Sequence, residues 1–245
     1  MQLLAALCLL VYVAVTTLIG ARLLRLGWRT RGRPERLLGA GSLLIGTIGM
    51  PLSVASGFGG AAGGVHVPLW LASEVLTQLG VVCFYAFAQQ VFRPGVPWAR
   101  AAVALAAVTL PACLAGAGRG LAAAAPETLS VEATGGWLLF CQFGYGGAFV
   151  WSAIEGLSHW ASARRRVAIG LLAPAVANRF LLFAIYGLAC TGITLANAAG
   201  IVLGLDIATS LLVLVPSAGF ALLASGAMFL AILPPAWYLE RLEAA

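Results

Sequence analysis

Polar side chains recur along one side of a helix predicted over residues 68–91. Glu74, Gln78, Tyr85 and Gln89 fall within an arc of about 60°, because successive helical residues turn by about 100°. The residues between them are mostly apolar. A carboxylate in such surroundings can hold a cation, contact a ligand or carry a proton. The pattern predicts that this side of the helix faces other helices and not lipid.

Further polar lines are predicted on three other helices. They comprise Tyr145 and Glu155 in residues 135–158, Arg179, Tyr186 and Asn197 in residues 175–199, and Asp206 beside the start of residues 207–232. Together the lines predict a polar seam inside a helical bundle. In one interpretation these groups hydrogen-bond one another as packing contacts, worth about 0.6 kcal/mol each. In the other they surround a small polar cavity, where Glu74 contacts a ligand or cation toward the exterior and Glu155 forms a cytoplasmic gate with Arg179.

The residue inventory excludes several kinds of membrane chemistry. The chain has no lysine, so it cannot form a Schiff base with retinal. His66 and His159 are predicted at opposite faces of the membrane, which disfavours a histidine-bound zinc or haem. Hydrolase and phosphate-loop motifs do not stand in suitable context. We therefore predict a protein that is not an enzyme, without catalytic residues, metal site or cofactor.

Small residues line one side of the helix predicted over residues 37–56. This helix-packing seam consists of Gly39, Ser42, Gly46, Gly49 and Ser53, at steps of three and four residues. Small side chains let a second helix approach closely. The seam predicts packing inside the chain or, alternatively, contact with a second copy. Pro51 removes one backbone donor and predicts a kink beside the seam.

Composition places all of these residues in a membrane protein. Of the 245 residues, 62% are hydrophobic and 9% are charged, whereas soluble domains carry roughly 25% charged residues. A membrane-spanning helix needs about 20 mainly apolar residues. The sequence predicts one all-α domain over residues 1–245, a seven-transmembrane-helix bundle with spans near 2–20, 37–56, 68–91, 101–118, 135–158, 175–199 and 207–232.

Arginine placement predicts the direction of these spans. If the chain crosses the membrane seven times, thirteen of the fourteen arginines fall on the same side of the membrane, and Arg119 is the exception. Because basic loops stay cytoplasmic, the N-terminus is expected outside and the C-terminus in the cytoplasm. The net charge of +6 then reflects attraction to anionic lipid headgroups and needs no nucleic acid. We expect a multi-pass protein of a cell membrane, and specifically of a bacterial inner membrane.

The depth of Arg179 depends on where the fifth helix ends. A sixth helix that began straight after Arg166 would place Arg179 near the bilayer centre, at a cost of about 2.5 to 3.5 kcal/mol. The favoured alternative lets the fifth helix continue through the arginines, stop at Gly170 and restart at Pro174. Arg179 then lies close to the cytoplasmic interface.

Three functional classes fit these features. The leading hypothesis is a receptor-like or sensory membrane module that uses the polar seam and a cytoplasmic or membrane protein partner. The second is a transporter of a small solute or proton-coupled carrier using Glu74 and Glu155. The third is a structural or assembly subunit of a membrane complex, docked through the helix-packing seam.

Overall fold

The computed structural model describes residues 2–57, 66–124, 131–205, 207 and 210–243. Within these ranges the chain is helical, without strands. The elements are α1 (Gln2–Arg29), α2 (Arg33–Ser42), the π-helix η1 (Leu43–Gly49), α3 (Met50–Ser56), α4 (Val67–Phe92), α5 (Pro97–Ala124), α6 (Val131–Thr134), α7 (Trp137–Ala168), α8 (Pro174–Val202), α9 (Leu211–Ile232) and α10 (Ala236–Glu243).

Seven helices of the described chain are long and apolar enough to cross a membrane, with α2, η1 and α3 forming one of them. The predicted number of spans and the all-α class are confirmed. The helices extend beyond the predicted spans, most clearly where α1 reaches Arg29 and α7 reaches Ala168. Helical hydrogen bonding satisfies the backbone in water as well as in lipid, and arginine favours helix. Apolar runs therefore mark where a helix meets lipid but not where it ends.

The turn between α7 and α8 forms at the predicted glycine and proline. Gly170 has φ of +72°, which suits a residue without Cβ. The Leu171 N–H donates to the Arg166 carbonyl at 2.9 Å, a bond typical of a glycine-terminated helix. Pro174 begins α8, so Arg179 lies near the start of that helix and is exposed. The predicted helix break at Gly170 and restart at Pro174 are confirmed, and the depth of Arg179 in the membrane stays a prediction.

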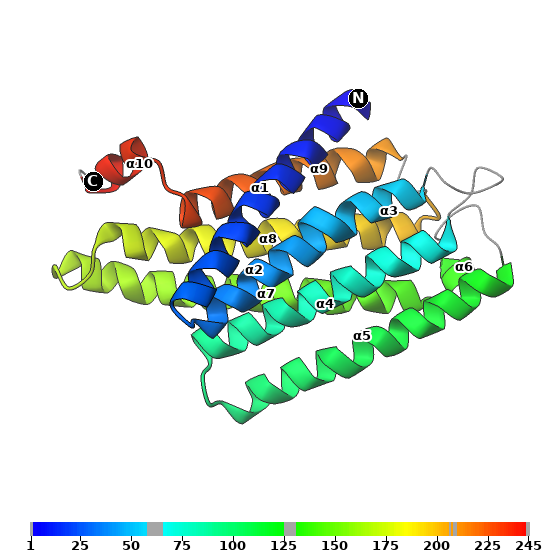
Figure 1. Cartoon of the computed structure of the whole chain (residues 1–245), viewed down its shortest axis with the longest axis horizontal. Helices are drawn as coiled ribbons and strands as arrows, with labels where there is room; N and C mark the ends of the chain where they lie inside the picture. The colour runs from blue at the N-terminus through cyan, green and yellow to red at the C-terminus, as the bar shows by residue number, and fades with distance from the viewer. Residues whose placement is uncertain (1, 58–65, 125–130, 206, 208–209, 244–245) are drawn as a thin grey trace.

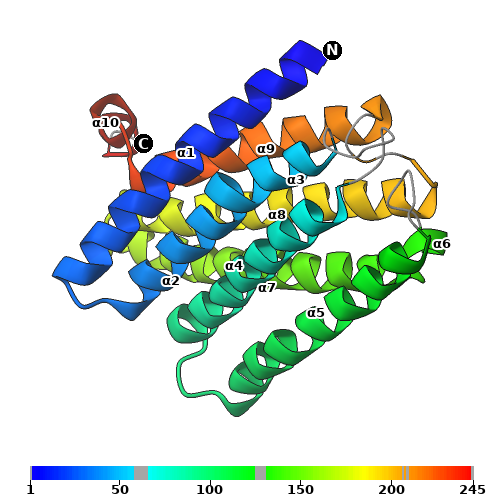
Figure 2. The same cartoon turned by 45° about the vertical axis from the view of Figure 1, so that its right-hand side comes forward.

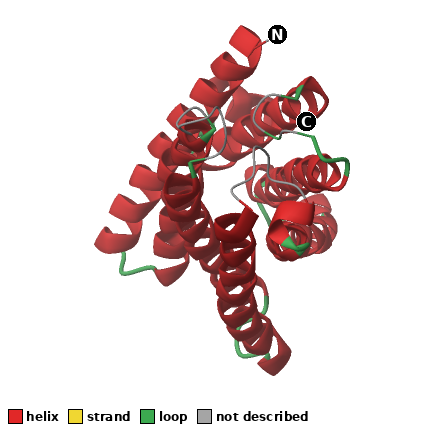
Figure 3. Ribbon diagram, turned by 90° about the vertical axis from the view of Figure 1, so that its right-hand side faces the viewer, coloured by secondary structure: helices red, strands yellow, loops and turns green. Residues whose placement is uncertain are grey.

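The connections alternate between the two ends of the bundle (Figure 1). We call one end the arginine end: it holds the α1–α2, α4–α5 and α7–α8 turns together with α10, at the left of Figure 1. The C-terminal end of α8, the N-terminal end of α9 and the short helix α6 lie at the opposite end. Figure 2 shows α1 slanting across the bundle and α5 at its edge. Figure 3 views the helices from the opposite end and shows them gathered side by side.

The predicted kink near Pro51 takes the form of a widened turn. Pro51 cannot donate to the carbonyl four residues earlier. Just before it, the Met50 N–H donates to the Ile45 carbonyl five residues earlier, which is the π-helical pattern. The side chain of Thr47 in this turn shares a hydrogen bond of 2.9 Å with Thr17 of α1. The widened turn is therefore fixed to α1 by a side-chain hydrogen bond.

The helix-packing seam lies between α1 and α4. A Cβ on Gly39 would stand 2.9 Å from the Gly20 carbonyl of α1, and one on Gly46 would collide with Thr16. A Cβ on Gly49 would stand 2.8 Å from Thr77 Oγ1 of α4. Ser42 is buried and donates to the Leu38 carbonyl at 2.8 Å, while Ser53 is half-buried. The seam is thus occupied inside the chain.

Candidate functional site

Two polar clusters join the same pair of helices, α4 and α7, at different depths. The first is the Glu74 cluster, made of Glu74, Gln78, Cys141 and Tyr145, all buried. The Tyr145 hydroxyl donates to Glu74 Oε2 at 2.6 Å. Gln78 Nε2 donates to Cys141 Sγ at 3.6 Å and to the Leu110 carbonyl of α5 at 3.0 Å. The cluster therefore ties three helices together through side chains that lipid could not satisfy.

A run of glycines makes α7 the meeting point of its neighbours. A Cβ on Gly144 would stand 2.5 Å from Leu110 of α5, and one on Gly146 would stand 3.1 Å from Thr194 of α8. A Cβ on Gly147 would stand 2.5 Å from the hydroxyl of Tyr85 in α4. That hydroxyl donates to the Gly144 carbonyl at 2.9 Å. Three helices therefore close on a single turn of α7 because it lacks side chains there.

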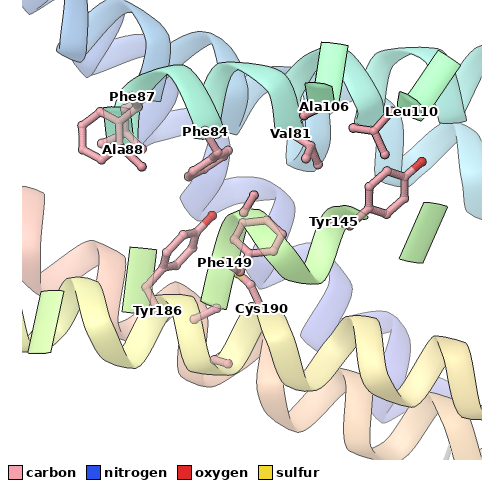
Figure 4. Close-up of a cluster of buried hydrophobic side chains, with 14 of the residues drawn as sticks. Val81, Phe84, Phe87, Ala88, Ala106, Leu110, Tyr145, Phe149, Tyr186 and Cys190 are labelled. Carbon is pink, nitrogen blue, oxygen red and sulfur yellow. The ribbon is translucent and has the colours of Figure 1, made fainter. Parts of the chain in front are cut away.

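An aromatic layer separates the Glu74 cluster from the arginine end. Figure 4 shows Phe84 of α4 facing Phe149 of α7 and Tyr186 of α8. The Phe84 ring centroid lies 5.4 Å from that of Phe149 and 5.8 Å from that of Tyr186. Phe87 stacks on Phe183 at 5.4 Å. These rings are the contact through which α4, α7 and α8 share one apolar core.

The second polar cluster is an ion pair at the arginine end. Arg93 Nε donates to Glu155 Oε1 at 2.6 Å, and Trp151 Nε1 donates to the same oxygen at 3.2 Å. The Glu155 side chain is 4% exposed and that of Arg93 is 46% exposed. The hydrogen bond to Glu155, reinforced by charge attraction, raises the pKa of Arg93 above its ordinary value. The buried acid is thus held by a cation that water or a headgroup can reach.

The second carboxylate oxygen of Glu155 accepts no hydrogen bond from the described residues. This oxygen, Oε2, is buried. Leaving a buried acceptor unpaired costs free energy, more for a charged group than for a neutral one. Glu155 is therefore the buried acid of this site with spare capacity to accept a donor.

The gate interpretation expected Glu155 to pair with Arg179, and the structure does not show this pair. The partner of Glu155 is Arg93, and Arg179 is exposed on α8. The reason is the relative position of two helices. Helices α4 and α7 run in the same direction, and Arg93, the first residue after α4, lies beside Glu155 of α7. The signal was present in the sequence, since Arg93 stands four residues after Gln89 on the polar side of that helix.

The remaining predicted residues are dispersed over the bundle. Gln89 is half-buried and its carbonyl accepts the Arg93 N–H at 3.1 Å. Tyr186 belongs to the aromatic layer, and Asn197 is half-buried on α8. Asp206 lies outside the described residues. Over the described ranges, His, Cys, Asp and Glu side chains form no group of three that could hold a metal.

One hydrogen bond that the sequence did not signal fixes the tail. Asn178 Nδ2 of α8 donates to the Tyr238 hydroxyl of α10 at 2.6 Å. The guanidinium of Arg241 lies 5.5 Å from the centre of the Trp237 ring in the same short helix. This bond holds α10 against the arginine end of the bundle, beside the turn that carries Arg179.

An open depression lies at the opposite end of α7. It has a volume of about 440 Å³ and is lined by Gly116, Gly120, Ala123, Glu132, Thr134, Gly135 and Trp137. Pockets that bind small molecules measure about 300 to 1,000 Å³. Trp137 packs on Gly116, where a Cβ would stand 2.6 Å from the indole. The depression therefore has the size for a small solute and offers one aromatic ring and one carboxylate.

Comparison of the chain with protein-family models, with curated proteins and with solved structures found no match.

Proposed function

We propose that the protein is a non-enzymatic, receptor-like or sensory membrane module in which α7 carries a change of state across the bilayer. The observation that supports this is the position of α7. Its first residue, Trp137, lines the depression, its middle holds Tyr145 against Glu74, and its far half holds Glu155 against Arg93. One rigid helix thus reaches a solute-sized surface at one end and a half-exposed ion pair at the other.

The depression is where a solute would act. Glu132 is exposed and Trp137 is 45% exposed, so both can be reached from outside the bundle. A carboxylate beside an indole ring attracts positively charged groups through charge and through the ring face. The expected solute is therefore small and carries an amine or another cationic group.

Transmission requires two arrangements of α7 relative to α4. Both polar clusters bridge these two helices, so a shift of α7 alters the Tyr145–Glu74 bond and the Arg93–Glu155 pair together. Packed interfaces tend to switch between discrete arrangements. With the arginine end in the cytoplasm, as the inside-positive pattern predicts, Arg93 would then present its charge to anionic headgroups or to a protein partner.

The proposal is tested by thermal melting in lipid nanodiscs. A panel of small amines is added to the purified protein, and at least one is expected to raise Tm. Glu132→Gln should abolish that rise, whereas Glu240→Gln, which removes an exposed carboxylate near the arginine end, should leave it intact. Spin labels at positions 94 and 171 should report a ligand-dependent change in distance. A panel without any shift, together with an unchanged label distance, would argue against the receptor.

A small transporter is the second candidate, and Glu74 favours it. This acid is buried inside a membrane-spanning helix, and acids at such depth often relay protons. In that case Glu74→Gln abolishes solute or proton flux in proteoliposomes. Wild-type proteoliposomes that carry no flux would remove this candidate and leave the receptor proposal standing.

A further inference from the structure

Two of the free cysteines lie opposite each other on neighbouring helices. Cys113 belongs to α5, and Cys141 lies one turn after the start of α7. Helix α5 runs away from the arginine end and α7 runs toward it (Figure 1), so the two helices are antiparallel. Along an antiparallel pair, facing positions rise in number on one helix as they fall on the other.

Two contacts between α5 and α7 fix which residues face each other. A Cβ on Gly144 of α7 would stand 2.5 Å from the side chain of Leu110 in α5. A Cβ on Gly116 of α5 would stand 2.6 Å from the indole of Trp137 in α7. These contacts lie one helical turn to either side of the two cysteines. The cysteines therefore occupy the facing positions between them.

Hydrogen bonds place the two sulfur atoms within reach of each other. Gln78 Nε2 of α4 donates to Cys141 Sγ at 3.6 Å and to the Leu110 carbonyl at 3.0 Å, so a single amide touches both α5 and α7. The thiols of Cys113 and Cys141 share a hydrogen bond. From such contact, a disulfide forms when the sulfur atoms close to a bond of about 2.05 Å.

The two thiols differ in how far a reagent can reach them. Cys141 is 0% exposed, whereas Cys113 is half-buried and follows the exposed residues Pro111 and Ala112. Buried thiols in apolar surroundings are unreactive, and partly exposed ones react first. An oxidant from the lipid therefore meets Cys113 first, and Cys141 can react only through Cys113.

We propose that Cys113 and Cys141 are a redox-active thiol pair that closes to a disulfide between α5 and α7, with a small apolar disulfide as the oxidant. Cys113 loses its proton and attacks one sulfur of the oxidant, which forms a mixed disulfide and releases one small thiol. Cys141 then loses its proton and attacks the Cys113 sulfur, which releases the second small thiol. The protein loses two electrons and two protons, and the oxidant gains them as two thiols.

The position of the pair connects its redox state to the depression. Gly116 and Trp137, one turn away, both line the depression, so the disulfide would fix the distance between two of its walls. The inside-positive pattern predicts that this half of the bundle faces outward, and disulfides persist in oxidising compartments outside the cytosol. The reaction involves no solute, so the thiol pair does not depend on the proposed receptor function.

Oxidation by 4,4′-dithiodipyridine in lipid nanodiscs tests this inference, because the reagent is an apolar disulfide whose released thiol absorbs light. The starting variant carries alanine at Cys8, Cys83 and Cys190. We expect it to release two thiols per chain and to lose the mass of two hydrogen atoms. Adding Cys141→Ala should stop the reaction after one thiol, with a pyridyl adduct left on Cys113. Adding Cys113→Ala instead should slow thiol release several-fold, because Cys141 is buried.

A variant that keeps Cys83 and Cys141 as its only cysteines is the matched control. Cys83 is half-buried like Cys113 but belongs to α4, so it should take up one adduct without forming a disulfide. A melting curve shows that each variant is folded. Stable adducts on both Cys113 and Cys141 would overturn the inference, as would a disulfide that forms equally fast in the control. Folded protein that releases no thiol would overturn it as well.

Discussion

Glu155 places a carboxylate inside the bundle while its partner, Arg93, remains half exposed. The two residues therefore differ in what their loss would leave behind. Without Arg93, a buried carboxylate stands alone beside Trp151, whereas without Glu155 the guanidinium turns to water or to a lipid headgroup. An unpaired buried charge is the more costly of the two outcomes.

A double-mutant cycle in lipid nanodiscs measures this asymmetry. Arg93→Gln should lower Tm by more than Glu155→Gln, and the double variant should be more stable than Arg93→Gln alone. The raised pKa of Arg93 keeps its guanidinium charged throughout the neutral range. Titration of Arg93 should therefore cause no change in the interaction energy of the pair between about pH 6 and about pH 9. Additive effects of the two substitutions would contradict the ion pair as the main contact of Glu155.

The α7–α8 interface depends on glycine at the scale of whole helices. A Cβ on Gly187 would stand 2.7 Å from the Phe149 carbonyl and 2.9 Å from the Ala153 nitrogen, and one on Gly156 would stand 3.0 Å from the Ala184 nitrogen. Backbone atoms cannot move aside as a flexible side chain can. The two helices therefore approach at a distance that any larger residue would increase.

Gly187→Ala is expected to destabilise the bundle by about 1 to 3 kcal/mol, the usual cost of overpacking. Gly226 of α9 provides the matched control, because a Cβ there meets nothing within 4 Å. Gly226→Ala should be neutral or stabilise by up to about 1 kcal/mol, since alanine favours helix. Unfolding in detergent measures both, and equal effects of the two substitutions would contradict the close approach.

The elements were largely predictable from sequence, but their pairing was not. Apolar length predicted seven spans, and Gly170 with Pro174 predicted the α7–α8 turn. The polar line from Glu74 to Gln89 predicted a face turned away from lipid, and Glu74 and Gln78 are indeed buried. The partner of Glu155 was missed, because helix order in space and relative depth decide which side chains meet, and neither is written in the spacing of one helix.

At the scale of the whole molecule, the positions of the arginines agree with the way successive helices run up and down the bundle. The α1–α2, α4–α5 and α7–α8 turns lie at one end of the bundle in Figure 1. Arg31 and Arg93 stand in the first two of these turns, and Arg166 stands in the last turn of α7. This alternation supports an odd number of crossings, while the direction across the membrane remains a prediction from the inside-positive pattern. The receptor proposal depends on that direction, because it places the depression outside and the Arg93 ion pair inside.

Cysteine accessibility in intact cells tests the membrane arrangement most directly. In a variant without the five native cysteines, single cysteines are placed at exposed positions: Thr30, Pro94 and Leu171 at the arginine end, and His66, Glu132 and Leu203 at the other. An impermeant maleimide should label the second set from outside, and the first set only after the membrane is opened. Labelling of two successive connections from the same side would contradict the seven-span bundle, and complete reversal would contradict its direction.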